Sequence, residues 1–156
     1  MNIQTFKIKF ESNSEAETYE FAQKTAKHIR IGQVIALNGN LGSGKTVFAK
    51  GFAKALGINE NISSPTFNIV CEYAWGDGKM FYHLDLYRIS NSSDAFAFGI
   101  NEYIYDENAI ILLEWPERIT DILPDDTLFI KIEHAGEQKR IISLSSNIFE
   151  NHQDIR

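Results

Sequence analysis

The feature that most constrains the fold of this chain is a glycine-rich motif at residues 39–46. Its sequence, Gly-Asn-Leu-Gly-Ser-Gly-Lys-Thr, matches the pattern G-x-x-x-x-G-K-[ST]. The apolar run Val34-Ile35-Ala36-Leu37 precedes it and is typical of a strand buried on both faces of a sheet. Apolar residues at helical spacing follow over residues 46–56. A buried strand, a glycine-rich turn and a helix in this order predict a phosphate-binding P-loop rather than a chance turn.

The residue types of this P-loop suit a nucleoside triphosphate with Mg²⁺. Glycines allow successive backbone N–H groups to point at phosphate oxygens, and the start of the helix adds a partial positive charge. We expect Lys45 to reach the β- and γ-phosphates and the Thr46 hydroxyl to bind Mg²⁺. The predicted nucleotide contacts in this segment are Asn40, Leu41, Gly42, Ser43, Gly44, Lys45, Thr46 and Val47.

Two acidic residues directly follow apolar runs that we interpret as strands. Asp85 follows Met-Phe-Tyr-His-Leu at residues 80–84, and Glu114 follows Ile-Ile-Leu-Leu at residues 110–113. Both should lie at the carboxyl edge of the sheet, where open α/β folds bind ligands. With Lys45 they form the predicted catalytic set: one carboxylate would bind Mg²⁺ while the other orients or deprotonates water. The sequence leaves this division open, and the alternative is that each is an ordinary strand-end carboxylate.

Three other positions have residue types that occur at catalytic or nucleotide sites. Thr66, in Ser64-Pro65-Thr66, lies between the P-loop helix and the next strand, where many P-loop proteins sense the γ-phosphate. We predict a nucleotide contact for Thr66, and a simple turn is the alternative. We interpret His83 and Cys71 as residues that fill positions within strands, because no triad-like spacing surrounds either.

The remaining apolar and glycine patterns predict an α/β protein. A capping box at residues 14–17 starts one helix, and charged residues alternate with apolar ones at residues 6–10, as in an edge strand. Strands are expected at residues 6–10, 66–73, 80–86, 110–113, 127–133 and 139–145, and helices at 14–30 and 94–98. We predict a P-loop NTPase-like three-layer fold, with central parallel strands flanked by antiparallel strands. Residues 1–146 should form a single nucleotide-binding domain, followed by a polar C-terminal tail at 147–156.

Composition narrows the classes of function. Lys and Arg total 15 against 21 Asp and Glu, for a formal net charge of −6, which argues against a free-standing nucleic-acid binder. A local basic patch stays compatible with this charge. Cys71 is the only cysteine, which favours a reduced, cytoplasmic setting without disulfides. No apolar run approaches the roughly 18 residues of a membrane span, so we expect a soluble protein with no membrane partner.

Four short motifs, in a fixed order, resemble those of one known family. They are the P-loop at 39–46, Ser-Pro-Thr at 64–66, His-Leu-Asp-Leu-Tyr-Arg at 83–88 and Leu-Glu-Trp at 113–115. Together they make the chain similar to the TsaE family, formerly YjeE. The resemblance implies an ATPase of bacterial tRNA threonylcarbamoyladenosine synthesis that uses ATP and Mg²⁺. It also implies docking on a TsaD–TsaB heterodimer to permit repeated turnover, weak hydrolysis alone, and tRNA contacted mainly through that complex.

The resemblance also carries expectations for single residues. It supports Lys45 and Thr46 at the nucleotide and Mg²⁺, Glu114 as a further metal contact and Asp85 as the acidic strand-end residue. It places Trp115 close to the nucleotide or to a partner surface. Arg140 takes the place of a late basic residue that we expect to touch the nucleotide, with a solvated hairpin arginine as the alternative. Two departures, Asn40 where aspartate is common and Pro116 after the tryptophan, could alter affinity or hydrolysis.

Two other functions are compatible with a P-loop. A small-molecule kinase uses the same phosphate cradle, although the sequence shows no acceptor pocket or arginine-rich lid. A non-catalytic module could use nucleotide binding only to regulate docking. A GTP switch is disfavoured because the chain has no Asn-Lys-x-Asp motif for reading guanine.

Overall fold

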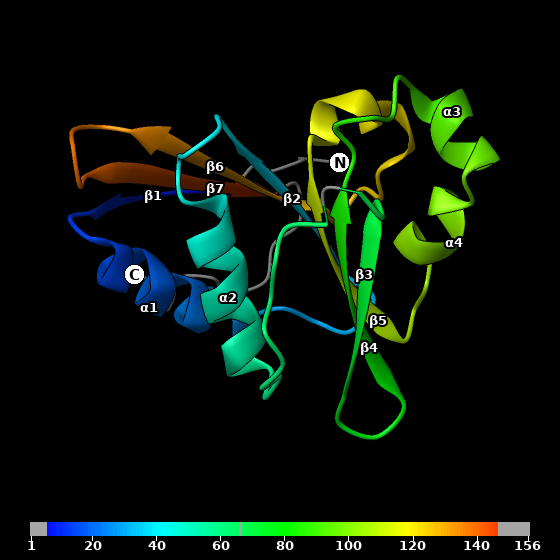
Figure 1. Cartoon of the computed structure of the whole chain (residues 1–156), viewed down its shortest axis with the longest axis horizontal. Helices are drawn as coiled ribbons and strands as arrows, with labels where there is room; N and C mark the ends of the chain where they lie inside the picture. The colour runs from blue at the N-terminus through cyan, green and yellow to red at the C-terminus, as the bar shows by residue number, and fades with distance from the viewer. Residues whose placement is uncertain (1–5, 66, 147–156) are drawn as a thin grey trace.

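The computed structural model describes residues 6–65 and 67–146, and within them seven strands form one mixed sheet (Figure 1). The strands are β1 (Phe6–Ser12), β2 (Val34–Gly39), β3 (Val70–Trp75), β4 (Lys79–Asp85), β5 (Ala109–Glu114), β6 (Leu128–His134) and β7 (Arg140–Ser146). Their order across the sheet is β1-β7-β6-β2-β5-β4-β3. The central strands β6, β2, β5 and β4 are parallel, whereas β1, β7 and β3 pair antiparallel. This arrangement confirms the predicted fold class, including β1 at an edge.

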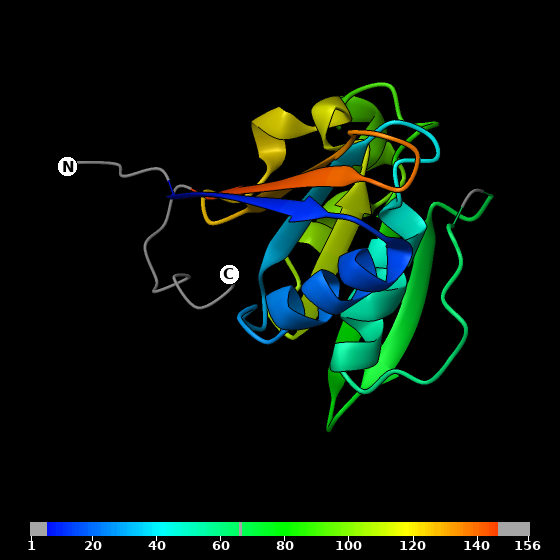
Figure 2. The same ribbon diagram turned by 90° about the vertical axis from the view of Figure 1, so that its left-hand side faces the viewer.

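Helices cover both faces of the sheet (Figures 1 and 2). The helices are α1 (Glu15–Ala26), α2 (Lys45–Ala55), α3 (Ser92–Ala97) and α4 (Ile100–Ile104), with short 3₁₀ turns η1 (Pro116–Arg118) and η2 (Thr120–Ile122). On one face, α1 and α2 bury a core that includes Phe48, Phe52 and Phe81. On the other face, α3, α4 and η1 enclose a second core around Leu84, Ile104 and Ile111. No helix of the described residues is long and apolar enough to cross a membrane.

The strand β2 and helix α2 form where the sequence predicts them. The first four residues of β2 are fully buried because both faces of this central strand are covered. Helix α2 packs against α1, and Gly51 makes this close approach possible. A Cβ atom at Gly51 would collide with the carbonyl oxygen of Tyr19 and lie 3.1 Å from the Ala22 Cβ atom. The P-loop is therefore held between a buried strand and a tightly packed helix.

Two boundaries differ clearly from the sequence predictions, and one helix was not predicted. Helix α1 ends at Ala26, not near Arg30. At its start the Ser14 hydroxyl accepts from the Glu17 N–H as a capping box requires, whereas the Glu17 carboxylate accepts from the N–H of Asn13 rather than of Ser14. Strand β3 begins at Val70 rather than at residue 66, because Ile69 has a φ of +62°, which interrupts extended structure. The helix α4 was not predicted, since it is only one turn long and follows Gly99 directly. The predicted C-terminal tail at 147–156 lies outside the described residues.

Candidate functional site

The P-loop contains two glycine residues whose backbone conformation other residues rarely adopt. Gly42 and Gly44 have φ angles of +77° and +106°, in the left-handed region that costs a side chain about 1–2 kcal/mol. Gly44 is the N-cap of α2, and no side chain caps the helix. The start of α2 therefore presents its backbone N–H groups without an internal partner.

Several backbone N–H groups of the P-loop are available to bind a ligand. Within the described residues, the backbone N–H groups of Gly42, Gly44, Lys45 and Thr46 donate to no other group, whereas the Ser43 N–H donates to the Asn40 carbonyl. These free donors lie in one loop at a helix start, where the helix dipole favours negative charge. The cradle thus fits a phosphate group in both geometry and charge.

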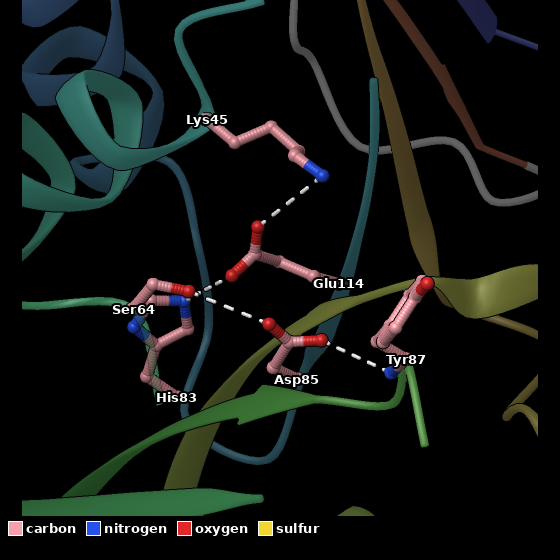
Figure 3. Close-up of polar contacts among 6 residues, drawn as sticks. All are labelled: Lys45, Ser64, His83, Asp85, Tyr87 and Glu114. Atoms are coloured by element: carbon pink, nitrogen blue, oxygen red, sulfur yellow. Dashed lines mark hydrogen bonds and ion pairs between the residues drawn. The ribbon is translucent and has the colours of Figure 1, made fainter. Parts of the chain in front are cut away.

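Behind the loop, Lys45 forms a chain of polar contacts with two residues of the sheet (Figure 3). The Lys45 Nζ atom lies 3.5 Å from Oε1 of Glu114, and the Nε2 atom of His83 lies 3.1 Å from Oε2 of the same carboxylate. The Glu114 and His83 side chains are 6% and 1% exposed. An ionised carboxylate can only accept hydrogen bonds, so the His83 Nε2–H donates to it. The buried Glu114 carboxylate is thus held from two sides, by Lys45 and by His83.

Burial and these partners act in opposite directions on the acidity of Glu114. Burial raises the pKa of the carboxyl group because it disfavours the charged form. The hydrogen bond and charge of His83, together with the Lys45 ammonium group, lower it by more, and the net pKa lies below the ordinary value. Glu114 is therefore ionised at neutral pH, as a metal ligand or a hydrogen-bond acceptor requires.

Asp85 lies beside Glu114 at the carboxyl edge of the sheet. Asp85 and Glu114 are direct neighbours in the parallel pairing of β4 with β5. The Asp85 carboxylate accepts from the Tyr87 N–H at 3.0 Å and from the Ser64 hydroxyl at 3.4 Å (Figure 3). The two predicted carboxylates thus lie together beside the P-loop lysine, and the loop that contains Ser64 contacts one of them.

Trp115 forms a wall of the site next to Lys45. Its φ and ψ angles of 61° and 50° place it in the left-handed region, so the chain turns sharply after Glu114. The Lys45 Nζ atom lies 5.3 Å from the centre of the Trp115 ring, and the Tyr87 ring meets it edge-on at 5.1 Å. A cation over an aromatic face is an attractive arrangement. Trp115 therefore lies beside the P-loop lysine, and its closeness to a nucleotide or a partner surface stays a prediction.

Arg140 contacts the P-loop itself. Its Nε atom donates to the Ser43 carbonyl at 2.9 Å, and one terminal nitrogen lies 3.4 Å from the Gly42 carbonyl. With Gly42, Gly44 and Val47, Arg140 lines a pocket of about 100 Å³ between the P-loop, the start of α1 and the β6–β7 turn. This geometry makes Arg140 a brace for the loop, and its contact with a nucleotide stays a prediction.

The other predicted residues divide into those at the loop surface and one that is not described. Asn40, Leu41 and Thr46 are exposed at the loop and the first turn of α2. Thr66 lies outside the described residues.

His83 belongs to the site, although the sequence predicted that it only fills a position within a strand. Its position two residues before Asp85 puts both side chains on one face of β4, and this alternation is the signal that could have identified it.

No group of three His, Cys, Asp or Glu side chains that could hold a metal ion by itself occurs in the described ranges. The oxygen donors near the P-loop are the Thr46 hydroxyl and the Asp85 and Glu114 carboxylates. Mg²⁺ is commonly bound by one or two carboxylates together with substrate phosphates and water. The donor set therefore fits Mg²⁺ that arrives with a phosphorylated ligand.

Comparison with known proteins agrees with the motifs. The model of the family "Threonylcarbamoyl adenosine biosynthesis protein TsaE" matches residues 12–142. The tRNA threonylcarbamoyladenosine biosynthesis protein TsaE of Bacillus subtilis is 39% identical over 140 residues, 89% of this chain and 85% of that protein. The protein of the same name from Borreliella burgdorferi is 41% identical over 138 residues, 86% of this chain and 97% of that protein.

A solved structure shares the fold as well. The crystal structure of Bacillus subtilis YdiB superposes with a TM-score of 0.78 and 34% identity, covering 93% of this chain and 88% of that one. The family match spans both carboxylates, the P-loop and Arg140. On these grounds the chain belongs to the TsaE family of threonylcarbamoyl adenosine biosynthesis proteins.

Proposed function

We propose that this protein is a Mg²⁺-dependent ATPase that serves its family's role in tRNA threonylcarbamoyladenosine biosynthesis. The observation that carries the proposal is the convergence of four free backbone donors, the Lys45 ammonium group and two carboxylates on one edge of the sheet. The donors suit a triphosphate, and the carboxylates suit a metal ion and a water molecule. Each group comes from an element whose position the fold fixes.

Lys45 changes partner in this proposal. Without a ligand, its ammonium group is paired with Glu114 at 3.5 Å in a site that is largely closed to solvent. A bound triphosphate offers Lys45 several anionic oxygens next to the amide cradle. The exchange would release one oxygen of Glu114 while His83 continues to hold the other. Glu114 is thereby freed for a new contact without losing its orientation.

Thr46, Asp85 and Glu114 are the residues that would hold Mg²⁺ and the attacking water. Bound Mg²⁺ would supply positive charge against the phosphate oxygens. The two carboxylates share the remaining tasks, metal contact and orientation of water, because they are neighbours in register. Measuring Mg²⁺ dependence for Asp85→Asn and Glu114→Gln separately would assign these tasks, since loss of a metal contact raises the Mg²⁺ concentration that activity requires.

We further propose that this ATPase activity is coupled to docking on a TsaD–TsaB heterodimer. Large apolar side chains are exposed around the mouth of the site: Leu41 is 96%, Phe67 is 80% and Tyr87 is 62% exposed. Apolar residues of this size in contact with solvent are typical of a surface that a partner covers. Docking there would exclude bulk water from the P-loop while the attacking water stays between the carboxylates, and would stimulate hydrolysis that is weak in the isolated protein.

Calorimetry and a hydrolysis assay test the proposal together. The wild-type protein should bind ATP with Mg²⁺, and phosphate release should rise when TsaD and TsaB are added. Lys45→Ala should lower ATP affinity by about 100-fold, because it removes the ammonium group next to the free backbone donors and leaves Glu114 without this ion pair. The matched control is Lys50→Ala, an exposed lysine of α2, which should change affinity less than about twofold.

Three outcomes would contradict the proposal. ATP binding with equal affinity in the wild type and Lys45→Ala would remove the P-loop from nucleotide recognition. Transfer of phosphate to a metabolite, with no stimulation by TsaD and TsaB, would favour a small-molecule kinase. Tight ATP binding with no hydrolysis under any condition would favour the non-catalytic module.

A further inference from the structure

A groove of about 670 Å³ lies on the sheet face opposite α1 and α2. Its floor is formed by β1, β7, β6 and the end of β2, and one wall by the segment of Pro116, Glu117 and Thr120. In Figure 1, α3 and α4 lie over the other end of the sheet, and no described helix covers this part of it. Among the described residues, four neighbouring strands therefore present an open face.

Strand register shows which side chains this open face presents. Lys9, Ser143, Lys131 and Asn38 form one row across β1, β7, β6 and β2. Lys7, Ser145, Phe129 and Ala36 form the adjacent row. The first row consists entirely of hydrogen-bond donors, and two of its four members are cations. We call these two rows the lysine face.

The charge of the lysine face contrasts with that of the whole chain, whose net charge is −6. Lys7 and Lys9 are exposed and have no ion-pair partner in the part of the chain that the structure describes. Lys131 lies 3.2 Å from Glu133, which belongs to the next row toward the β6–β7 turn together with Glu11. Glu11 and Glu133 thus lie toward one end of the strands and Lys7 and Lys9 toward the other, while Glu117 lies in the wall of the groove.

From this arrangement we propose that the lysine face binds the sugar-phosphate backbone of tRNA. Three cations interleaved with serine and asparagine donors suit the anionic oxygens of a nucleic-acid strand. The half-buried Phe129 ring adds an apolar floor against which a sugar or base can rest. The family acts in tRNA modification, so an RNA strand is the polyanion that this face meets.

This site is separate from the proposed ATP site. The cradle of α2 opens above the carboxyl ends of β4 and β5, whereas the lysine face covers β1, β7 and β6. Asn38 connects the two regions because it immediately precedes the P-loop glycine at position 39. The inference does not depend on nucleotide binding, and its test can be made without nucleotide.

The experiment measures binding of an unmodified tRNA transcript to the full chain by fluorescence anisotropy over a series of salt concentrations. The variant Lys7→Gln/Lys9→Gln/Lys131→Gln should bind at least about tenfold more weakly at low salt. The slope of log affinity against log salt should become shallower by about 2, since each contact with single-stranded phosphate contributes about 0.7. A matched control, Lys24→Gln/Lys50→Gln/Lys54→Gln, removes the same charge from α1 and α2 and should change affinity less than twofold.

Each remaining outcome is decisive. The proposal is overturned if the wild type binds no tRNA at low salt, if both triple variants lose affinity equally, or if neither does. Displacement of tRNA by poly-L-glutamate at matched charge would show that the face binds acidic polypeptides, and would also overturn it. ATP binding by the lysine-face variant, measured by calorimetry, should equal that of the wild type. This result would show that the variant is folded and that tRNA binding can be lost while ATP binding is kept.

Discussion

The Nε2 atom of His83 lies 3.1 Å from the Glu114 carboxylate, in a site where the His83 side chain is only 1% exposed. The other ring nitrogen, Nδ1, has no hydrogen-bond partner among the described residues. The hydrogen bond to Glu114 is therefore the polar contact that fixes the orientation of this buried imidazole. His83 is therefore a positioning residue for that carboxylate.

His83→Ala is expected to lower kcat for partner-stimulated ATP hydrolysis by about 10–100-fold, as for other residues that orient a ligating or catalytic group. The KM for ATP should change little, because His83 does not face the cradle. His83→Gln, whose side-chain amide can donate from nearly the same position, should recover part of the loss. If Ala and Gln variants were equally impaired while both stayed folded by thermal denaturation, His83 would only fill space.

The lowered pKa of Glu114 predicts how stability depends on pH. Because the folded-state pKa lies below its ordinary value of 4.5, ionised Glu114 stabilises the fold above that value. This contribution is lost as the pH falls through the lowered pKa. The free energy of unfolding of the wild type should therefore fall more steeply between about pH 5 and pH 3 than that of Glu114→Gln. Urea denaturation at several pH values measures both.

The exposed neighbour Glu117 provides the control for this measurement. Glu117→Gln should retain the acid dependence of the wild type, since an exposed carboxylate contributes little to stability. Parallel pH profiles for the wild type and Glu114→Gln would mean that Lys45 and His83 do not stabilise the ionised carboxylate.

Arg140→Ala should loosen the P-loop in the absence of any ligand. The substitution removes the donors to the Ser43 and Gly42 carbonyls, so amide hydrogen exchange over residues 39–46 should become faster. Arg140→Lys should restore little, because a single ammonium group cannot reproduce the fork of the guanidinium. A lower ATP affinity with unchanged exchange in the free protein would instead support direct contact between Arg140 and the nucleotide.

Gly51→Ala should destabilise the protein, although alanine favours helices by about 1 kcal/mol. The new Cβ atom would meet the backbone carbonyl of Tyr19, which cannot move without separating α1 from α2. We expect a net loss of about 1–2 kcal/mol in urea denaturation, within the range found for overpacked cores. Lys50→Ala, on the exposed side of the same helix, should stay within about 0.5 kcal/mol of the wild type. A stabilised Gly51→Ala protein would show that the two helices can separate freely.

Local sequence predicted the elements that create the site. The apolar run of β2, the glycines and the lysine of the P-loop act within a few residues of one another, so their pattern is visible in one segment. Asp85 and Glu114 were located by a rule about strand ends, and their adjacency follows from parallel pairing. The P-loop and the two carboxylates could be predicted because they depend on the spacing of apolar residues and on the direction of the strands, and both can be read from the sequence.

The contacts that sequence could not give join residues far apart in the chain. His83 and Glu114 are 31 residues apart, and their contact depends on which strands are neighbours and in which register. Arg140 and Ser43 are 97 residues apart and meet because the β6–β7 turn lies over the P-loop. The late start of β3 depends on the positive φ of Ile69, whose carbonyl accepts from the Asp85 N–H at 2.8 Å. Tertiary context outweighs the β-propensity of isoleucine there.

The strand order also governs how this protein can be made. In the described sheet, the P-loop strand β2 lies between β5 and β6, which are translated some 70 to 100 residues later. During synthesis the backbone groups and apolar side chains of β2 therefore lack their sheet partners at first. Likewise, β1 pairs with β7, which is translated last of the described strands. Contacts this distant in sequence slow folding and leave the nascent chain open to aggregation. The P-loop strand thus gains its sheet partners near the end of translation, and cells that make this protein quickly should depend on chaperones for its yield.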